Sequence, residues 1–325
     1  MTHEFHFATW AHSVSNFGEN PQEVERHVKR LADAGFGLII PCVKNPPGYA
    51  DFITDVAKVN PSYPDWDVLK VLAESATEHG MKVHPWFCVF TEGAQSALLN
   101  QRPDLAAAFE ESNMRWACAC HPEVQAYELA LYGSIADNYP IHGLHLDYMR
   151  TGGLCRCDYC KEQMTALGVD VSTMSSKDPG FAQWADWRCG RITAFVEQMR
   201  RLTQSNGIEL SAAVFGDLPS CRNSNGQDWA LWAEKNLVDF LFPMNYDNST
   251  RNVKLRTQQH LALVGGRAPI WEGLGVASSN SQLTTEVMVE QIQTVKQAGA
   301  KGVVLFHYPA LSDEALAAIG SLLHD

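Results

Sequence analysis

Short apolar runs alternate along the chain with longer stretches in which apolar residues recur at helical spacing. Several of these runs are apolar on both faces, which is typical of strands in a parallel sheet that is covered on both sides. Eight runs are present, at residues 5–10, 37–43, 82–90, 143–149, 209–216, 238–246, 269–276 and 302–308. The pattern therefore predicts eight buried strands.

The stretches between the runs predict helices with recognisable ends. The stretch 21–35 opens with Pro21 and closes with Gly35, and the stretch 65–80 has an acidic start and a glycine stop. Further helices are predicted over 121–139, 184–207, 228–236, 285–299 and 312–325. Eight alternations in 325 residues predict an α/β protein whose residues 1–325 form a single (β/α)8 TIM barrel.

An open doubly wound sheet is the alternative arrangement of alternating strands and helices. Such a sheet would usually carry a glycine-rich phosphate loop after its first strand. The residues at that place, TWAHSVSN, contain no glycine, and the closed barrel is therefore favoured.

The charge balance limits the partners of the chain. There are 37 Asp and Glu residues against 25 Lys and Arg, a net charge of -12, which argues against nucleic acid or an anionic membrane surface as the main partner. No apolar run approaches the ~18 residues of a membrane span. The start of the sequence shows no basic and apolar leader, so we expect a cytoplasmic protein, with export open if the start has been trimmed. The oligomeric state is not predicted.

Active sites of such barrels lie at the carboxyl-terminal ends of the strands, where this chain carries mostly carboxylates and aromatics. Pyranose rings present apolar C–H faces to aromatic rings, and cleavage of a glycosidic bond requires a proton donor and a partner carboxylate. The sequence thus predicts a carbohydrate substrate and glycosidase chemistry. Candidate substrate-binding residues are Trp10, His84, Trp86, His145, Tyr148, Arg150, Asn245, Tyr246, Trp271, His307 and Tyr308.

Asp147 is the leading catalytic candidate, because it ends the fourth run within an apolar segment where an unpartnered carboxylate is costly. An ion pair with Arg150 that braces the barrel mouth is the structural alternative. The partner carboxylate is predicted to be Glu272, which follows the seventh run's Trp271, or Asp247, which follows the sixth run; Asp217 is a weaker candidate. If no second acid reaches the site, assistance by an N-acetyl group of the substrate is the mechanism to test.

Five of the nine cysteines fall into two groups, Cys118 with Cys120, and Cys155 with Cys157 and Cys160. Three close thiolates and one upstream thiolate are sufficient ligands for a tetrahedral structural zinc, which would leave no open position for catalysis. Disulfide bonds are the alternative for an exported protein, and free thiols are the third reading. No organic cofactor is predicted.

Several segments together resemble the family-10-like glycosyl hydrolases, TIM-barrel proteins of bacteria of which some act on cell-wall glycans. The resemblance covers roughly residues 5–320. His142 stands where the family usually has Asp, and the cysteine group after the fourth run is a second departure. The segments that carry it are GMKVHPWF (80–87), RPDLAAAFEESNMRWACACHPEVQAY (102–127), IHGLHLDYMR (141–150), QDWALWAEKNLVDFLFPMNYD (227–247) and KGVVLFHY (301–308).

Resemblances to other glycosidase barrels imply further roles. Amylase-type barrels place a nucleophile at the end of the fourth strand, which implies that Asp147 is either nucleophile or acid/base. The string MNYD (244–247) is similar to the sixth-strand motif of chitinases, whose tyrosine supports the acetamido group of the substrate. The C-x-C-x-x-C spacing with an upstream cysteine resembles the structural zinc site of family 42 β-galactosidases.

Two other classes of function remain open from the sequence. One is a carbohydrate-binding barrel without catalysis. The other is a barrel lyase or isomerase acting on a sugar-derived substrate, which would need a Lys or His base with a metal. For that second class the strand ends offer Lys44 as a weak candidate.

Overall fold

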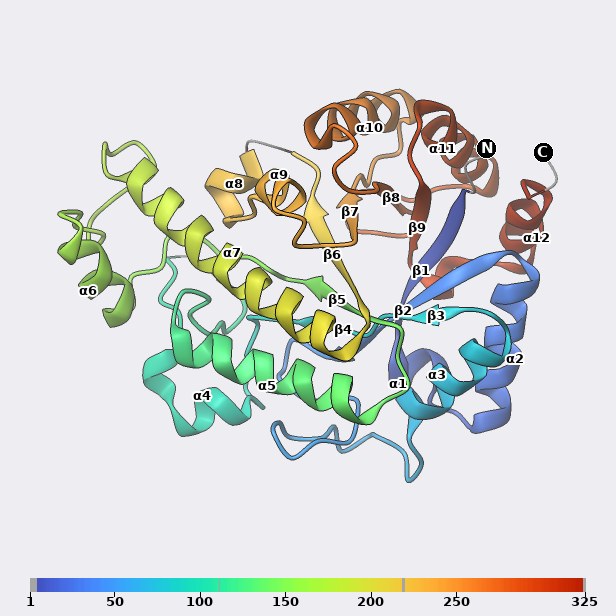
Figure 1. Ribbon diagram of the computed structural model, residues 1–325, viewed down its shortest axis with the longest axis horizontal. Helices are drawn as coiled ribbons and strands as arrows, with labels where there is room; N and C mark the ends of the chain where they lie inside the picture. The colour runs from blue at the N-terminus through green and yellow to red at the C-terminus, as the bar shows by residue number, and fades with distance from the viewer. Residues whose placement is uncertain (1–4, 111, 218–219, 324–325) are drawn as a thin grey trace.

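The computed structural model describes residues 5–110, 112–217 and 220–323. Its strands run parallel and close into a barrel, because β1 pairs with β2 on one side and with β9 on the other. Helices surround the barrel (Figure 1), so the predicted (β/α)8 architecture is confirmed. The strands are β1 His6–His12, β2 Phe36–Lys44, β3 Lys82–Val83, β4 Trp86–Cys88, β5 Gly143–Asp147, β6 Glu209–Phe215, β7 Phe240–Met244, β8 Trp271–Gly275 and β9 Gly302–Phe306.

The third barrel strand is divided into β3 and β4. Pro85 lies in the break and has no amide hydrogen to donate to a ladder. Both segments pair with β2, and β4 continues the barrel by pairing with β5. The eight predicted apolar runs therefore correspond to the eight strand positions of the barrel.

Helices cover the outside of the barrel, and all seven predicted helices are present. Figure 1 shows the long helix α7 crossing in front of the strands, with α5 beside it and α6 projecting at the edge of the molecule. The helices are α1 Ser13–Phe17, α2 Pro21–Asp33, α3 Val68–Glu78, α4 Ala97–Gln101, α5 Pro122–Asn138, α6 Asp158–Ala166, α7 Phe181–Asn206, α8 Ser220–Asn225, α9 Trp229–Glu234, α10 Thr250–Val264, α11 Thr285–Ala298 and α12 Asp313–Ser321.

Helix α10 was not predicted from the sequence, although it has well-formed ends. The Ser249 side chain accepts a hydrogen bond from the Asn252 amide at its start, and Gly265 ends it in the left-handed conformation. Its buried face includes the polar residues Thr257 and His260, so the apolar periodicity of a covering helix is weak there.

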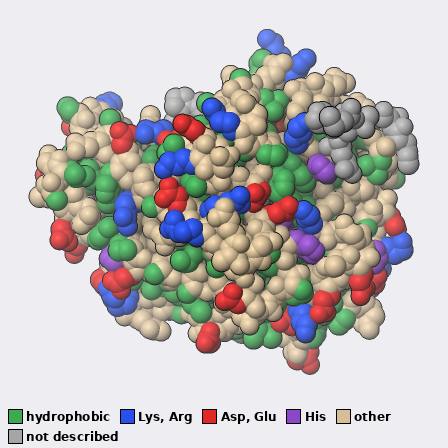
Figure 2. Space-filling model, in the orientation of Figure 1, with side chains coloured by type: hydrophobic (Ala, Val, Ile, Leu, Met, Phe, Trp, Pro, Cys, Tyr) green, Lys and Arg blue, Asp and Glu red, His purple; other side chains and the backbone are tan. Residues whose placement is uncertain are grey.

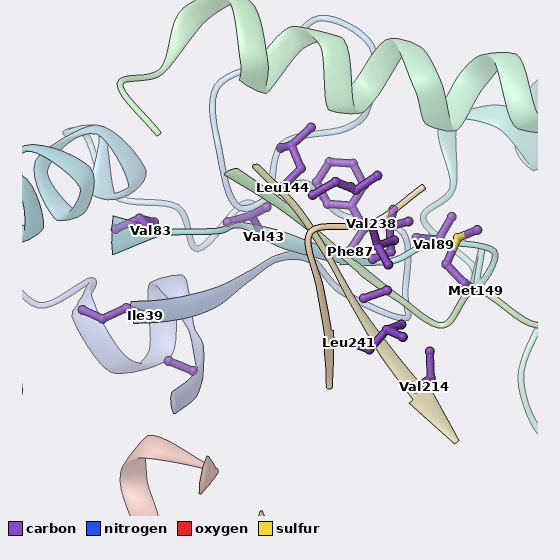
Figure 3. Packing of buried hydrophobic residues seen from close by; sticks show 14 of the residues in the cluster. Ile39, Val43, Val83, Phe87, Val89, Leu144, Met149, Val214, Val238 and Leu241 are labelled. Carbon is purple, nitrogen blue, oxygen red and sulfur yellow. The ribbon is translucent and has the colours of Figure 1, made fainter. Parts of the chain in front are cut away.

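Successive side chains on each strand point alternately into the barrel and outward to the helices. The inward set forms one aromatic-rich cluster that includes Trp10, Phe242 and Trp271. The outward set packs against the helices, and Figure 3 shows several of its members, among them Phe87 and Leu144, gathered beside the strands. This alternation decides which strand-end residues can reach the barrel mouth.

Charged side chains of both signs are visible on the surface of the molecule. On the face shown in Figure 2, acidic and basic side chains are interspersed and do not gather into a patch of one sign. Among the residues that the structure describes, no helix combines the length and apolarity needed to cross a membrane.

Candidate active site

A cavity of about 390 Å³ opens at the carboxyl-terminal end of the barrel strands. Six aromatic side chains form much of its wall and floor: Trp10, Trp86, Tyr148, Phe215, Tyr246 and Phe306. Its polar lining residues are His12, Asp147, Arg150, Ser278, Ser279 and Asn280. Aromatic faces and a few convergent polar groups are the usual lining of a small-molecule or sugar site.

Asp147 lies at the end of β5 and points into this cavity. The backbone amide of Tyr148 donates a hydrogen bond of 2.6 Å to its Oδ1, in a turn where Tyr148 has a positive φ of 54°. Burial raises the pKa of Asp147 to about 6, although Arg150 and the Tyr148 amide oppose that shift. Asp147 can therefore hold a proton at mildly acidic pH and release it near neutrality.

Arg150 stacks between two aromatic rings beside Asp147. Its guanidinium carbon lies 4.4 Å from the ring centre of Tyr148 and 4.7 Å from that of Phe215. The Tyr148 ring in turn stacks on Trp86, with ring centres 6.5 Å apart. These contacts fix the wall next to the carboxylate and leave the positive charge of Arg150 near the cavity.

Tyr246 follows β7 on the inward side and lies edge-on to Trp10, with ring centres 6.4 Å apart. Burial, followed by the neighbouring Asp147 and Tyr148, raises the pKa of its hydroxyl well above 10. The hydroxyl therefore stays neutral and keeps its proton to donate. Trp10, Trp86, Tyr148, Arg150 and Tyr246 are thus the predicted substrate-binding residues that line the cavity.

The loop after β8 contributes a polar edge that was not predicted from the sequence. Ser278, Ser279 and Asn280 line the cavity, and Ser278 is held by hydrogen bonds to Ser281. The signal for this edge was the string ASSNS (277–281) directly after the seventh apolar run. His12 also lines the cavity, and burial, followed by His307, lowers its pKa.

A chain of hydrogen bonds runs beneath Trp10 through the barrel interior. The Trp10 indole donates to Nε2 of His145 (3.2 Å), so Nδ1 of that ring carries the hydrogen and donates to Ser211 Oγ (2.9 Å). Ser211 lies 3.1 Å from His84 Nδ1, and His84 Nε2 lies 3.1 Å from a carboxylate oxygen of Glu209. His145 and His84 therefore lie below the cavity floor and support Trp10 from beneath.

Burial keeps both of these histidines neutral by lowering their pKa values. Trp271 also lies within the barrel interior, where it stacks on His6 and Phe242. The structure thus places three predicted substrate-binding residues, His84, His145 and Trp271, among the packed interior side chains and outside the cavity lining.

Glu272 points outward from β8 and does not reach the cavity. Its carboxylate pairs with Nδ1 of His260 on α10 at 2.8 Å and accepts a hydrogen bond of 3.1 Å from Asn245. Both Glu272 and Asn245 are fully buried between the strands and α10. The predicted pairing of Glu272 with Asp147 is therefore not formed, because the Glu272 side chain points outward from β8 toward α10.

We expect Glu272→Gln to lower the free energy of unfolding and to leave kcat near that of the wild type. The charge of Glu272 raises the pKa of His260 against the lowering effect of burial, so the pair favours folding below pH ~6.5. That contribution is lost as pH rises through the raised pKa of folded His260. The loss in free energy of unfolding should be about 1.5–3 kcal/mol near pH 6 and smaller at pH 8, measured by urea denaturation. A large fall in kcat would contradict the structural role.

Asp247 also lies outside the cavity. Its carboxylate accepts hydrogen bonds from the Ser249 amide (2.8 Å) and the Asn252 side chain (3.0 Å), and Arg256 pairs with it at 3.2 Å. Burial alone would raise its pKa, but these donors lower it, so it stays ionised. Asp247 therefore organises the start of α10, and the predicted pairing with Asp147 is not formed here either.

The remaining strand-end candidates have other surroundings. Tyr308 is buried against α2, with its hydroxyl 2.6 Å from His27 Nδ1. His307 lies near His12 but does not line the cavity. Asp217 is exposed, and Lys44 is fully buried in ion pairs with Glu92 and Glu128. Among the described ranges, Asp147 is the one carboxylate in the cavity lining.

A second cluster of reactive side chains lies apart from the cavity. The sulfur atoms of Cys118, Cys155, Cys157 and Cys160 all lie within 4.8 Å of one another, and all four residues are buried. Such a group could hold a metal ion. Cys120, the fifth predicted ligand, is buried next to them but lies outside this set of four.

Comparisons with known proteins agree with this fold. The family model described as glycosyl hydrolase-like 10 matches residues 7–265. Glycosyl hydrolase DigH from Escherichia coli strain K12 is 22% identical in an alignment of 233 residues, which covers 61% of this chain and 49% of DigH. The chain therefore spans about half the length of this curated relative.

Solved structures with the same barrel include two with nearly complete mutual coverage. The glycoside hydrolase domain of PgaB (BpsB) from Bordetella bronchiseptica superposes with a TM-score of 0.75 at 14% identity, over 97% of this chain and 98% of that one. The catalytic domain of β-amylase from Paenibacillus polymyxa gives 0.68 at 11% identity, over 98% and 97%. At these identities the likeness shows the fold alone.

Proposed function

The chain belongs to the glycosyl hydrolase-like 10 family, and on that basis we propose that it hydrolyses a glycosidic bond with Asp147 as its acid and base. The substrate of this proposal is an oligo- or polysaccharide with a 2-acetamido sugar on the non-reducing side of the bond that is cut. The acetamido oxygen of that sugar takes the part that a second carboxylate plays in other glycosidases.

The observation that carries this proposal is the single carboxylate of the cavity lining. Glycosidases with paired carboxylates hold the two groups about 5–10 Å apart across the scissile bond. Glu272 and Asp247 are both held outside the cavity by other partners. A substrate that brings its own nucleophile needs one protein group that can give and then take a proton, and a pKa of about 6 suits both tasks.

The proposed reaction has two steps. In the first step, protonated Asp147 donates its proton to the glycosidic oxygen, the bond from that oxygen to C1 breaks, and the acetamido oxygen bonds to C1. In the second step, the Asp147 carboxylate takes a proton from water while the water oxygen attacks C1 and the acetamido group is released. The products are two sugars, and the configuration at C1 is retained.

Neighbouring residues would orient the sugar for these steps. Trp10, Trp86 and Tyr148 offer ring faces for apolar sugar surfaces, and the hydroxyl of Tyr246 can donate to the acetamido oxygen. Arg150 offers up to five N–H donors beside Asp147. We therefore expect Tyr246→Phe to reduce kcat more strongly for acetamido substrates than for analogues without that group.

The experiment is a comparison of matched oligosaccharides with and without N-acetyl groups. The proposal expects hydrolysis of the N-acetylated form, release of the product in the starting anomeric configuration by NMR, and inhibition by a thiazoline analogue of the bicyclic intermediate. Hydrolysis with inversion, or equal rates on both forms, would overturn the acetamido mechanism. Binding of the sugars without any turnover would instead support a non-catalytic carbohydrate-binding barrel.

The pH profile of kcat/KM should report the protonation of Asp147. Because the acid form acts in the first step, kcat/KM should fall as pH rises above about 6. The charge of Arg150 lowers the pKa of Asp147, so Arg150→Gln should move this alkaline limb to higher pH, and Arg150→Lys should leave it near its original place. A limb that stays fixed, or moves to lower pH, in Arg150→Gln would argue against Asp147 as the titrating acid.

A further inference from the structure

The cysteine cluster joins two segments that are far apart in the sequence. Cys118 lies before α5, Cys155 and Cys157 lie in the loop after β5, and Cys160 lies in the first turn of α6. Their four sulfur atoms lie within 4.8 Å of one another, and each residue is at most 8% exposed. Four thiols converge here without any part in the proposed cleavage of sugars.

The spacing of the sulfur atoms fits a single tetrahedral ion. A disulfide would hold two sulfurs about 2.05 Å apart, whereas the Sγ atoms of Cys118 and Cys160 are 3.6 Å apart. Four sulfurs placed 2.3 Å from a central zinc ion form a tetrahedron with edges of about 3.8 Å. The 3.6 Å separation of Cys118 and Cys160 is therefore close to the edge of such a tetrahedron, and the other sulfur atoms lie within 4.8 Å.

We propose that Cys118, Cys155, Cys157 and Cys160 bind one Zn²⁺ ion as thiolates. Thiolate ligands select zinc over hard cations such as Mg²⁺ and Ca²⁺, which prefer oxygen ligands. A four-cysteine shell is closed, so the ion has no free position for water or substrate. The role of the ion is to hold the fold.

The surroundings of the cluster supply positive charge. A zinc ion with four thiolates carries a net charge of -2. Arg191 on α7 donates from Nε to the carbonyl oxygen of Cys120 at 3.1 Å. Arg188, one turn earlier on the same helix, is fully buried, and its NH groups donate to the Thr151 hydroxyl and to three backbone carbonyls, all of them uncharged. Because Arg188 lies on the same face of α7 as Arg191, a negatively charged cluster would partly compensate this buried guanidinium.

The cluster supports the wall of the sugar cavity. The Arg156 amide donates to the Ala108 carbonyl at 2.8 Å, which ties the two bridged segments together next to the cysteines. Gly152 packs against the rings of Phe109 and Trp116, where an added Cβ would lie 2.9 Å from Phe109. The Trp116 ring then packs on Tyr148, with ring centres 6.1 Å apart. A bound ion would thus fix the segment that carries Tyr148 and Arg150.

Metal analysis of the full chain, purified under reducing conditions without chelator, tests the proposal directly. Elemental analysis should find one zinc ion per chain, and Cys157→Ser should lose it. Cys221→Ser is the matched control, because Cys221 is equally buried but lies on α8 outside the cluster, and it should keep the metal. Wild type that binds no zinc, that holds iron instead, or whose cluster cysteines are joined as disulfides by mass spectrometry would overturn the assignment.

Cobalt reconstitution provides a readout that does not depend on a variant folding. Wild-type protein freed of metal should take up one Co²⁺ and show the thiolate charge-transfer and visible bands of a tetrahedral four-sulfur site. Its thermal midpoint should rise on binding zinc, since an ion that binds the native state alone stabilises it. Absence of these bands would overturn the proposal, whether or not the protein hydrolyses sugars.

A further pair of variants tests the choice of ligands. Cys120→Ser should keep the zinc ion and the cobalt spectrum, because Cys120 lies outside the set of four. Cys118→Ser should lose both. The reverse result would overturn the assignment of Cys118 as the ligand from this segment.

Discussion

Replacing Asp147 with asparagine is expected to lower kcat by about 100- to 10,000-fold, the range over which general acid–base catalysis acts. The amide keeps the size of the side chain and can still accept the Tyr148 amide hydrogen bond. It cannot donate a proton to a glycosidic oxygen or take one from water. Sugar binding should therefore survive, and the measurement is steady-state kinetics together with calorimetric binding of a substrate oligosaccharide.

Asp247→Asn is the matched control for this experiment. Asp247 follows β7, which β6 separates from β5, and is held outside the cavity by Ser249 and Asn252. Its replacement should leave kcat near that of the wild type, with a small loss of stability at the start of α10. Equal activity of Asp147→Asn and wild type would remove the basis of the proposed function, and a large loss of kcat in Asp247→Asn would restore the paired-carboxylate mechanism.

The barrel itself could be predicted from the sequence because each strand is an uninterrupted apolar run between helical stretches. All eight runs became strands, and the family resemblance drawn from motifs such as IHGLHLDYMR is confirmed by the family model. Helix α10 escaped prediction because its buried face carries Thr257 and His260, which form part of a polar contact with Glu272. A buried ion pair therefore concealed the helical periodicity that the other helices display.

The site was harder to predict, because an uninterrupted apolar run does not show which residues point into the barrel and which point outward to the helices. A strand that alternates polar and apolar residues shows its inner face, but a strand that is apolar on both faces does not. At the start of β8, Trp271 points inward and Glu272 outward. After β7, Tyr246 points inward and Asp247 outward. Two neighbouring residues on a strand therefore have different surroundings, one inside the barrel and the other against α10.

The sequence also does not show how deep in the barrel each inward-pointing side chain lies. His145 lies on β5 two residues before Asp147, His84 lies in the break before β4, and Trp271 begins β8, and all three are buried in the barrel interior below the cavity. Gly143, at the start of β5, would place a Cβ 2.4 Å from the His84 ring, which locates His84 low in the barrel. The cysteine cluster was visible in the sequence as a spacing, but only the fold showed that Cys118 joins the set of four and Cys120 does not.

Lys44→Met is expected to be the most destabilising of these substitutions, by about 3–5 kcal/mol in the free energy of unfolding, because it leaves buried acids without their cation. The side chains of Lys44, Glu92 and Glu128 are all fully buried. The Lys44 ammonium donates to Glu128 at 2.8 Å and to the Val89 carbonyl at 2.8 Å, and it also pairs with Glu92. Burial alone would lower the pKa of Lys44, but the two carboxylates raise it, so the charge is kept.

Two carboxylates around one lysine leave one negative charge to be neutralised by a proton. Burial raises the pKa of Glu128 well above its usual value, although Lys44 opposes that shift, so this buried group of acids can hold the proton. Without Lys44 a second proton must be bound, and the loss of stability in Lys44→Met should therefore grow as pH rises. Adding Glu128→Gln to Lys44→Met should restore part of the stability, because one of the two unpaired acids is removed.

Lys29→Met is the matched control. Lys29 makes an ion pair of 2.8 Å with Asp33 on the surface of α2, where both side chains are more than half exposed. Its replacement should change the free energy of unfolding by no more than about 1 kcal/mol. Urea denaturation of the three variants at pH 6 and pH 8 measures the difference. Equal losses of unfolding free energy in Lys44→Met and Lys29→Met would mean that the buried carboxylates can be protonated or hydrated with little loss of free energy. The ion cluster would then contribute little to the stability of the barrel.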